Sequence, residues 1–343
     1  MAEPALETLD GTGSNKNARS LPVPVAGTGN RGRKGDAMLR KSRAVFPAWA
    51  LVVGILPAVV LQVVMGLGPS LATFVLSFTD ITGVKGVPWH FIGLANYREF
   101  FVQQSTRDLM LVMKNTVVFC VAVTVIQNAI ALLIALALNS DLIKGRGFFR
   151  AVIFMPVVLG VLVTSLVWRL VLNPMEGPAA WLLALVGLKS GFYNAASSAL
   201  GSVIFTQIWM AMGYSMVINL AGLQAIPGEL YEAGQLDGAT GWNRFRYITF
   251  PLLWPTVNVN ILLAVIGSLQ SFQVILLTTG GRNMATQTLS ARVMYFAFNI
   301  NAGSGAGAMR QGYGATWAMV LFVFILAATL LYQKTMNRKE EQP

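Results

Sequence analysis

Few side chains in this chain could carry covalent or metal chemistry, and they are scattered. His90 is the only histidine and Cys120 the only cysteine. Neither has a cluster of acids or other sulfur ligands near it, so no metal site is predicted. The G-x-x-x-x-G-K-[ST] loop that cradles the phosphates of ATP is absent from the sequence. We therefore expect no enzyme active site and no cofactor, and any energy for work has to come from another chain.

Neutral polar side chains inside long apolar runs are the second chemical signal. Amides, hydroxyls and aromatic faces suit an uncharged, hydroxyl-rich solute, but they also suit hydrogen bonds between membrane helices. Both interpretations stay open for each of these residues. They are Gln127, Gln207, Trp209, Tyr214, Asn219, Ser268, Gln270 and Ser271.

The elements that hold these residues are predicted to be membrane helices. Of the 343 residues, 55% are hydrophobic and 11% are charged, and the mean hydropathy is +0.61. This composition excludes an ordinary soluble enzyme, a disordered regulator and a secreted disulfide scaffold. Six apolar runs are long enough to cross a hydrocarbon core of about 30 Å at about 1.5 Å per residue. They cover residues 44–78, 112–139, 149–172, 200–222, 252–277 and 315–332. The fold class is therefore an all-α membrane protein with six transmembrane helices.

The basic residues predict the orientation of these helices. The segments on the side of both termini hold 16 of the 25 lysines and arginines, and the opposite loops hold 7. By the positive-inside rule, both termini are expected in the cytoplasm of a multi-pass cell-membrane protein. The net charge of +11 is thus explained by topology and not by nucleic acid binding. We expect residues 1–42 to be a disordered basic cytoplasmic tail, 43–333 the membrane domain, and 334–343 a second cytoplasmic tail.

The segment of residues 226–251, between the fourth and fifth runs, predicts a compact helix-turn-helix. Pro227 suits the first turn of a short helix that carries an apolar stripe. Gly238 is expected to end this helix. Thr240 can cap a second short helix that carries Trp242 and Phe245 on one face. The apolar residues of the pair are available either to the chain itself or to a partner.

This segment resembles the EAA loop of ABC-importer permeases, in particular those of the carbohydrate-uptake, maltose-type class. The resemblance rests on Glu232-Ala-Gly-Gln-Leu-Asp-Gly-Ala239, followed by Phe245, Ile248 and Pro251. Further motifs match in the same order along the chain. They are Ser77-Phe-Thr-Asp80, Gly93-Leu-Ala-Asn-Tyr97, Lys114-Asn-Thr116, Gly145-Arg-Gly-Phe-Phe-Arg150, Met155-Pro156, Trp168, Asn173-Pro174, Leu223-Gln-Ala-Ile-Pro227, Thr279-Gly-Gly281 and Gly312-Tyr-Gly-Ala315. Two positions depart from the family pattern: Gly234 replaces its second alanine, and Arg282 replaces a proline.

The resemblance implies a sugar-transporting permease that works with several partners. These are a second permease subunit, a cytoplasmic ABC ATPase dimer, an extracytoplasmic solute-binding protein, the sugar and the lipid bilayer. The residues implied in ATPase coupling are Glu232, Ala233, Leu236, Asp237, Gly238, Ala239, Phe245 and Pro251. Those implied in the substrate pathway are Tyr214, Ser268, Gln270 and Ser271, of which Ser268 and Ser271 are expected to share one helix face.

Two other transport functions remain as alternatives. Some permeases of this subclass carry glycerol phosphate, but a phosphate would require basic residues along the path, and the basic residues within the runs, Lys114, Arg150 and Arg169, all lie near the run ends. An ion-coupled secondary carrier usually has a carboxylate inside the membrane, and none of the 14 acidic residues lies well inside a run. An uncharged sugar or oligosaccharide is therefore the preferred substrate.

Overall fold

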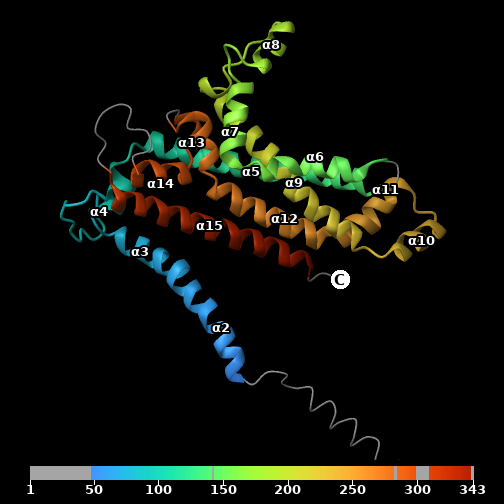
Figure 1. Cartoon of the computed structure of the whole chain (residues 1–343), viewed down its shortest axis with the longest axis horizontal. Helices are drawn as coiled ribbons and strands as arrows, with labels where there is room; N and C mark the ends of the chain where they lie inside the picture. The colour runs from blue at the N-terminus through green and yellow to red at the C-terminus, as the bar shows by residue number, and fades with distance from the viewer. Residues whose placement is uncertain (1–47, 141–142, 282–283, 299–308, 341–343) are drawn as a thin grey trace, which may run out of the picture. The chain divides into compact units, whose positions relative to one another are not determined.

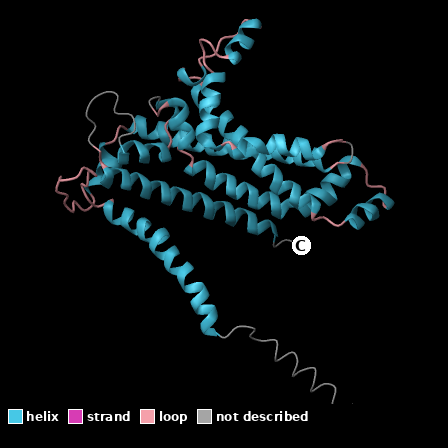
Figure 2. Ribbon diagram, viewed as in Figure 1, coloured by secondary structure: helices cyan, strands magenta, loops and turns pink. Residues whose placement is uncertain are grey.

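The computed structural model describes residues 48–140, 143–281, 284–298 and 309–340. Within these ranges the chain is helical, and its only β-pairing is one isolated bridge between Thr79 and Phe91. Figure 2 shows helices joined by loops. The chain divides into two compact units, residues 1–66 and 67–343. The predicted tail of residues 1–42 lies outside the described residues.

The first unit contains α2, Ala48–Gln62, which leads into a π-helical turn at Val63–Leu67. α3, Gly68–Leu76, follows at the start of the second unit. Pro69 sits in the first turn of α3, where its missing N–H removes no helical hydrogen bond. The helix from Val52 to Leu76 has 25 residues and is apolar enough to cross a membrane.

Four further long helices are apolar enough to span a membrane, so the all-α membrane fold is confirmed for the described residues. They are α5 (Thr106–Asn139), α9 (Ala199–Gln224), α12 (Phe250–Gln270, preceded by helical residues from Gly241) and α15 (Gln311–Glu340). Figure 1 shows them running side by side. Within the part of the chain that the structure describes, five helices are long and apolar enough to span a membrane, or six if the bent pair described next is one span.

The predicted third span, 149–172, is not a straight helix. It consists of α6, Arg146–Val158, and α7, Gly160–Val171, which are bent by 97° relative to each other. Gly160 has a φ of +71°, a left-handed conformation that ends a helix and suits glycine. In Figure 1, α7 leaves the direction of the long helices while α6 follows it.

The predicted fifth span, 252–277, is also interrupted. α12 ends at Gln270, and Ser271 has the extended backbone angles φ −73° and ψ 101°. The chain then resumes as α13, Gln273–Thr279, and α14, Leu289–Phe298. The last helix, α15, continues through 334–340, beyond the predicted end of the membrane domain.

The core lies where α5, α9 and α12 pack together. One buried cluster contains Ala131, Leu138 and Met216, together with Leu223 and Leu253. Glycines let the helices approach closely: a Cβ on Gly213 of α9 would lie 2.5 Å from the Ile153 carbonyl oxygen of α6. Small residues at such crossings are typical of membrane helix packing.

Candidate functional site

A helical hairpin closes one end of the second unit. It consists of α10 (Gly228–Leu236), α11 (Gly241–Arg244) and a π-helical turn at Phe245–Thr249 that joins α11 to α12. We call these residues, 228–249, the α10–α11 hairpin. They match the helix-turn-helix expected from the sequence.

The turn of the hairpin has a defined hydrogen-bond pattern. Gly238 has a φ of +78°. Its N–H donates to the Gln235 carbonyl oxygen at 3.0 Å, and the Ala239 N–H donates to the Gly234 carbonyl oxygen at 2.8 Å. This pair of bonds is a Schellman motif, which satisfies carbonyls at the end of α10. Glycine suits the left-handed position because it has no Cβ.

Two contacts hold α10 against the π-helical turn. Gly234 is buried, and a Cβ placed on it would lie 2.5 Å from Cδ1 of Ile248. The hydroxyl groups of Tyr231 and Thr249 lie 3.2 Å apart, within hydrogen-bond distance. The guanidinium of Arg244 also lies over the Tyr231 ring, 5.6 Å from its centroid. A side chain at position 234 would collide with Ile248, so the glycine that replaces the family's alanine lets α10 lie close to the π-helical turn.

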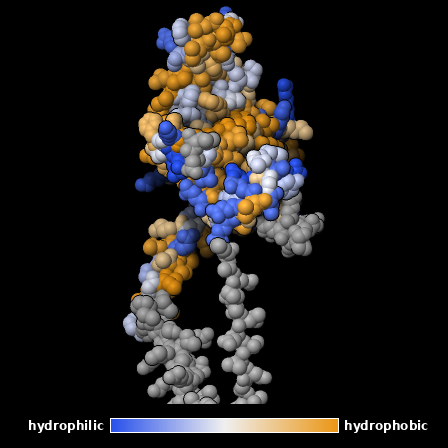
Figure 3. Space-filling view, turned by 90° about the vertical axis from the view of Figure 1, so that its right-hand side faces the viewer, coloured by the Kyte–Doolittle hydropathy of each residue, from blue (hydrophilic) through white to orange (hydrophobic). Residues whose placement is uncertain are grey.

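The outer surface of the hairpin carries most of the predicted coupling residues. Leu236 is 91% exposed and Trp242 67% exposed. Glu232, Ala233, Asp237 and Gly238 are exposed, as is Pro251 at the start of α12, whereas Ala239 and Phe245 are half-buried. Figure 3 looks onto this end and shows a hydrophilic face interrupted by apolar patches. Apolar side chains this exposed are typical of a surface that binds a partner.

An aromatic ladder leads from the hairpin into the long helix. The ring centroids of Trp242 and Phe245 are 5.4 Å apart, those of Phe245 and Phe250 5.8 Å, and those of Phe250 and Trp254 5.5 Å. The helical residues run without a break from Gly241 to Gln270, a stretch of 30 residues. A displacement of α11 therefore acts directly on α12.

A cavity of about 180 Å³ lies where α5, α9 and α12 meet; we call it the central cavity. Its lining includes no charged side chain and is made by Val123, Gln127, Gln207, Ala211, Tyr214, Ser215, Asn260, Leu263, Ala264, Gly267 and Ser268. The amide of Gln127 donates to the Ser215 hydroxyl at 2.7 Å. The amide of Asn260 donates to the Ser215 carbonyl oxygen at 3.0 Å. Ser215 thus joins all three helices at the wall of the cavity.

The predicted pathway residues divide into two groups. Tyr214, which is 50% exposed, and Ser268 line the central cavity. Gln270 is exposed and lies outside its lining, as does Ser271. The expectation that Ser268 and Ser271 share a helix face is wrong, because α12 ends at Gln270. The Ser271 hydroxyl instead donates to Oε1 of Gln207 at 2.9 Å and ties the helix break to α9.

Two polar residues of the cavity were not singled out from the sequence, Ser215 and Asn260. Their signal was spacing: Ser215 follows Gln207 by eight positions on α9, and Ser268 follows Asn260 by eight on α12. Such spacing places each pair on one face of its helix. The sequence did not show that the two faces meet.

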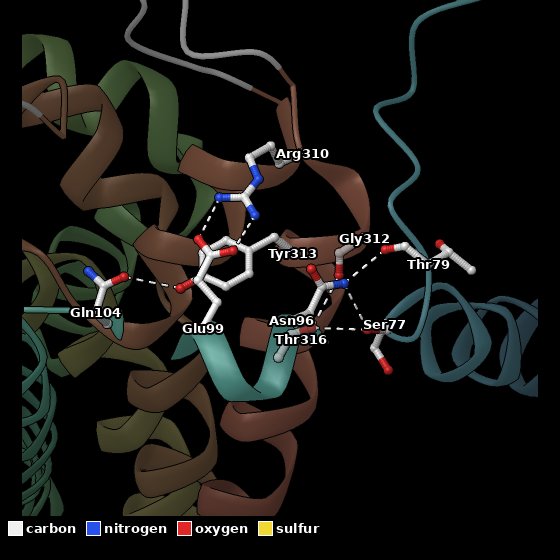
Figure 4. A network of polar contacts seen from close by, with 9 residues as sticks. All are labelled: Ser77, Thr79, Asn96, Glu99, Gln104, Arg310, Gly312, Tyr313 and Thr316. Carbon is white, nitrogen blue, oxygen red and sulfur yellow. Dashed lines mark hydrogen bonds and ion pairs between the residues drawn. The ribbon is translucent and has the colours of Figure 1, made fainter. Parts of the chain in front are cut away.

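A polar network joins α3, α4 and α15 at the end opposite the hairpin (Figure 4). Arg310 donates two hydrogen bonds to the Glu99 carboxylate, at 2.6 and 2.5 Å. This bond to Glu99 raises the pKa of Arg310 above its ordinary value. Asn96, in α4 (Ala95–Arg98), donates to the carbonyl oxygens of Ser77 and Thr79 at 3.0 and 2.8 Å. The network fixes the start of α15 against the end of α3.

Among the described residues, no group of three or more His, Cys, Asp or Glu side chains could hold a metal ion. The geometry thus offers a hairpin with exposed apolar side chains, an uncharged polar cavity and one continuous helix between them.

Comparison with known proteins gives consistent matches. Residues 127–336 match the model of the family described as "Binding-protein-dependent transport system inner membrane component". The trehalose/maltose transport system permease protein MalF of Thermococcus litoralis is 33% identical over 82% of this chain and 91% of its own length. The sn-glycerol-3-phosphate transport system permease protein UgpA of Agrobacterium fabrum is 30% identical over 74% of this chain and 83% of its own.

A solved structure shows the same fold. It is a chain of a bacterial alginate ABC transporter in complex with an alginate pentasaccharide-bound periplasmic protein. The TM-score is 0.72 at 20% sequence identity, and the match covers 90% of this chain and 99% of that chain.

Proposed function

Because the chain belongs to the inner-membrane components of binding-protein-dependent transport systems, we propose that it is the permease subunit of an ABC importer for an uncharged sugar or oligosaccharide. It is a multi-pass plasma-membrane protein by its family and its apolar helices. In the proposed orientation the α10–α11 hairpin and both termini face the cytoplasm, in agreement with the distribution of basic residues.

The central cavity is the observation that carries the substrate class. Its polar groups are amides and hydroxyls, and one aromatic side chain, that of Tyr214, contributes to its lining. Sugar hydroxyls pair with such groups through hydrogen bonds worth about 0.5–1.5 kcal/mol each. A volume of about 180 Å³ in one subunit suits half of a pathway that a second permease completes.

The α10–α11 hairpin is the proposed contact with a cytoplasmic ATPase dimer. Leu236 and Trp242 project apolar surface, with Glu232 exposed beside them for polar contact. Ala233, Asp237, Gly238, Ala239, Phe245 and Pro251 complete the coupling set. Closure of the ATPase pair would move the hairpins of the two permeases together, and the continuous helix to Gln270 would carry that movement to the central cavity.

An extracytoplasmic solute-binding protein is the proposed source of the sugar. The alginate transporter with the same fold was solved with its periplasmic protein. The end opposite the hairpin, fixed by Glu99 and Arg310, is the side on which such a protein would dock.

Glycerol phosphate remains the second candidate, since the UgpA relative is named for it. A phosphate in a pathway requires cationic partners. The lining of the central cavity contains none, and Arg169 of α7 directs one guanidinium nitrogen to the Leu277 carbonyl oxygen at 3.5 Å. The geometry therefore favours the uncharged solute.

Reconstitution tests the proposal. The tagged chain is purified in mild detergent with its co-purifying subunits, placed in vesicles, and given ATP, binding protein and a panel of sugars alongside glycerol phosphate. We expect uptake of one sugar and stimulation of ATP hydrolysis by the loaded binding protein. Uptake of glycerol phosphate and of no sugar would make glycerol phosphate the substrate and contradict the proposal of an uncharged sugar. A chain that transports without any ATPase would overturn the importer function.

A further inference from the structure

A lateral arm leaves the helix bundle at the bend between α6 and α7. The arm comprises α7 and α8, Pro178–Leu185, with the loops that flank α8. α6 packs along α9 and starts at the hairpin end of the bundle, where Arg150 donates to the Leu138 carbonyl oxygen at 3.5 Å. Because α7 makes an angle of 97° with α6, it runs across the direction of the membrane helices.

The length of α6 sets the depth of the arm. Its 13 residues rise about 20 Å, which is less than a hydrocarbon core of about 30 Å. If α6 enters the hydrocarbon core at its first residue, the bend at Gly160 lies inside the core, in the half away from the hairpin. The 12 residues of α7 then extend about 18 Å sideways at this depth. With the bend so placed, the chain reaches α8 in the far leaflet.

The side chains of the arm separate into a packed face and an exposed face. Ala179, Ala180 and Leu183 of α8 pack against a buried cluster of the bundle. The opposite face is apolar and unpartnered within the described residues: Trp181, Leu182, Leu185, Val186 and Leu188 are 58–68% exposed. Figure 3 shows this part, at the top of the view, as largely hydrophobic surface.

A hollow beside α8 brings two opposite charges to this apolar face. It has a volume of about 810 Å³, and its lining includes Trp181, Leu188, Glu176 and Lys189. An indole ring and an exposed ammonium group next to apolar side chains are typical of the boundary between acyl chains and headgroups. The ammonium group of Lys189 complements a lipid phosphate.

We propose that the α7–α8 arm lies in the outer leaflet, with the exposed face of α8 against phospholipid acyl chains and Lys189 at the level of their phosphates. The lipid contact follows from the bend and the exposed face. Only the assignment to the outer leaflet rests on the orientation given with the proposed function.

Nitroxide accessibility in the assembled transporter, reconstituted in phosphatidylethanolamine and phosphatidylglycerol vesicles, tests the lipid contact. In a Cys120→Ala background, labels are placed at Leu182→Cys and, as a second site, at Leu185→Cys. Controls are Ala180→Cys on the packed face of the same helix, Val323→Cys on the exposed side of α15, and Gln235→Cys on the hairpin. We expect collisions with oxygen to exceed those with a water-soluble nickel chelate severalfold at 182 and 185, and the reverse at 235.

Two results overturn the lipid contact. Nickel collisions above oxygen collisions at both sites place α8 in water. Low collision rates with both reagents, as expected at Ala180→Cys, place a protein surface, such as the second permease, over α8.

The leaflet is tested separately in intact cells with a membrane-impermeant maleimide. Lys189→Cys is expected to react from outside, and Gln235→Cys only after the cells are opened. The opposite pattern overturns the orientation, and with it the outer leaflet, while leaving the lipid contact to the nitroxide result.

Discussion

At the scale of single residues, the predicted pathway residues divide into those that line the central cavity and those that do not. Tyr214 lines the cavity and is 50% exposed overall. Ser271 lies outside the lining, and its hydroxyl is occupied by Gln207. Two residues that the sequence alone treats alike are therefore expected to differ in function.

Tyr214→Ala is expected to raise the KM for the transported sugar by up to about tenfold, because one hydrogen bond and the ring contact are lost. Tyr214→Phe keeps the ring, so its KM should lie between those of Tyr214→Ala and the parent. Ser271→Ala should leave KM near the parent value but lower the thermal stability, because Oε1 of Gln207 loses its donor. Uptake kinetics measure KM, and thermal unfolding in detergent measures stability. A larger KM effect at Ser271 than at Tyr214 would contradict the assignment of Tyr214 to the pathway and Ser271 to helix packing.

At Gly234, a tertiary contact changes the effect on stability that the sequence alone predicts. From the sequence, glycine in place of alanine is expected to weaken α10 by about 1 kcal/mol. In the structure the same position packs against Cδ1 of Ile248. The sequence alone indicates the helix propensity of Gly234. It does not show that Ile248, which follows the turn and α11, packs against it.

A double-variant series checks this packing. Gly234→Ala alone should gain little stability, because the new methyl group forces Ile248 to shift. Ile248→Val removes Cδ1, and in that background Gly234→Ala should gain about 1 kcal/mol. Unfolding midpoints of the four proteins give the coupling between the two sites. Equal effects of Gly234→Ala in both backgrounds would show that the contact is unimportant.

At the scale of elements, hydropathy predicted the positions of the membrane helices and missed their interruptions. Runs such as 112–139 and 200–222 became α5 and α9, because a long apolar segment has to satisfy its backbone internally. The 97° bend at Gly160 and the end of α12 at Gln270 were not predicted. Both interruptions depend on the backbone angles of single residues, Gly160 and Ser271. Hydropathy is summed over side chains and carries no information on backbone angles.

The bend itself can be assigned to one residue. Gly160→Ala is expected to destabilise the protein by about 1–2 kcal/mol, because an alanine is strained at φ +71°. Nothing lies within 4 Å of the added methyl group, so a clash contributes nothing. Pro156→Ala, in α6, is expected to leave the bend in place.

Distance measurements between nitroxides at Phe148→Cys and Leu170→Cys, in a Cys120→Ala background, report the bend. A straight helix would separate these positions by about 33 Å. We expect a shorter distance in both the parent and Pro156→Ala. A distance near the straight-helix value in Pro156→Ala would show that Pro156, and not Gly160, causes the bend.

At the scale of the whole molecule, the chain contains a proposed pathway and a proposed docking surface but no nucleotide loop. In the proposed function, transport therefore depends on surface contacts with other chains. The motif in the sequence indicated the proposed docking segment, and the structure adds which of its side chains are exposed, led by Leu236 at 91% exposure.

Glu232→Lys and Leu236→Ser are each expected to abolish sugar uptake while membrane insertion stays normal. Both side chains are exposed, so neither substitution disturbs packing within the chain. Co-purification of the ATPase should fall with Leu236→Ser, and insertion is followed by the amount of protein in the membrane fraction. Gln235→Ser, an exposed neighbour outside the proposed contact set, is the control. Normal uptake by Glu232→Lys would contradict the coupling role.

In the proposed coupling, the unbroken helix from Gly241 to Gln270 would act as a lever of unequal arms. If the π-helical turn at Phe245–Thr249 is the fulcrum, the short arm is the four residues of α11, about 6 Å, and the long arm is the 21 residues of α12, about 32 Å. An ångström of travel at the hairpin then becomes about five at the far end of α12, at one fifth of the force. In the proposed coupling, a short displacement produced by the ATPase at the hairpin would thus become a longer displacement at the far end of α12.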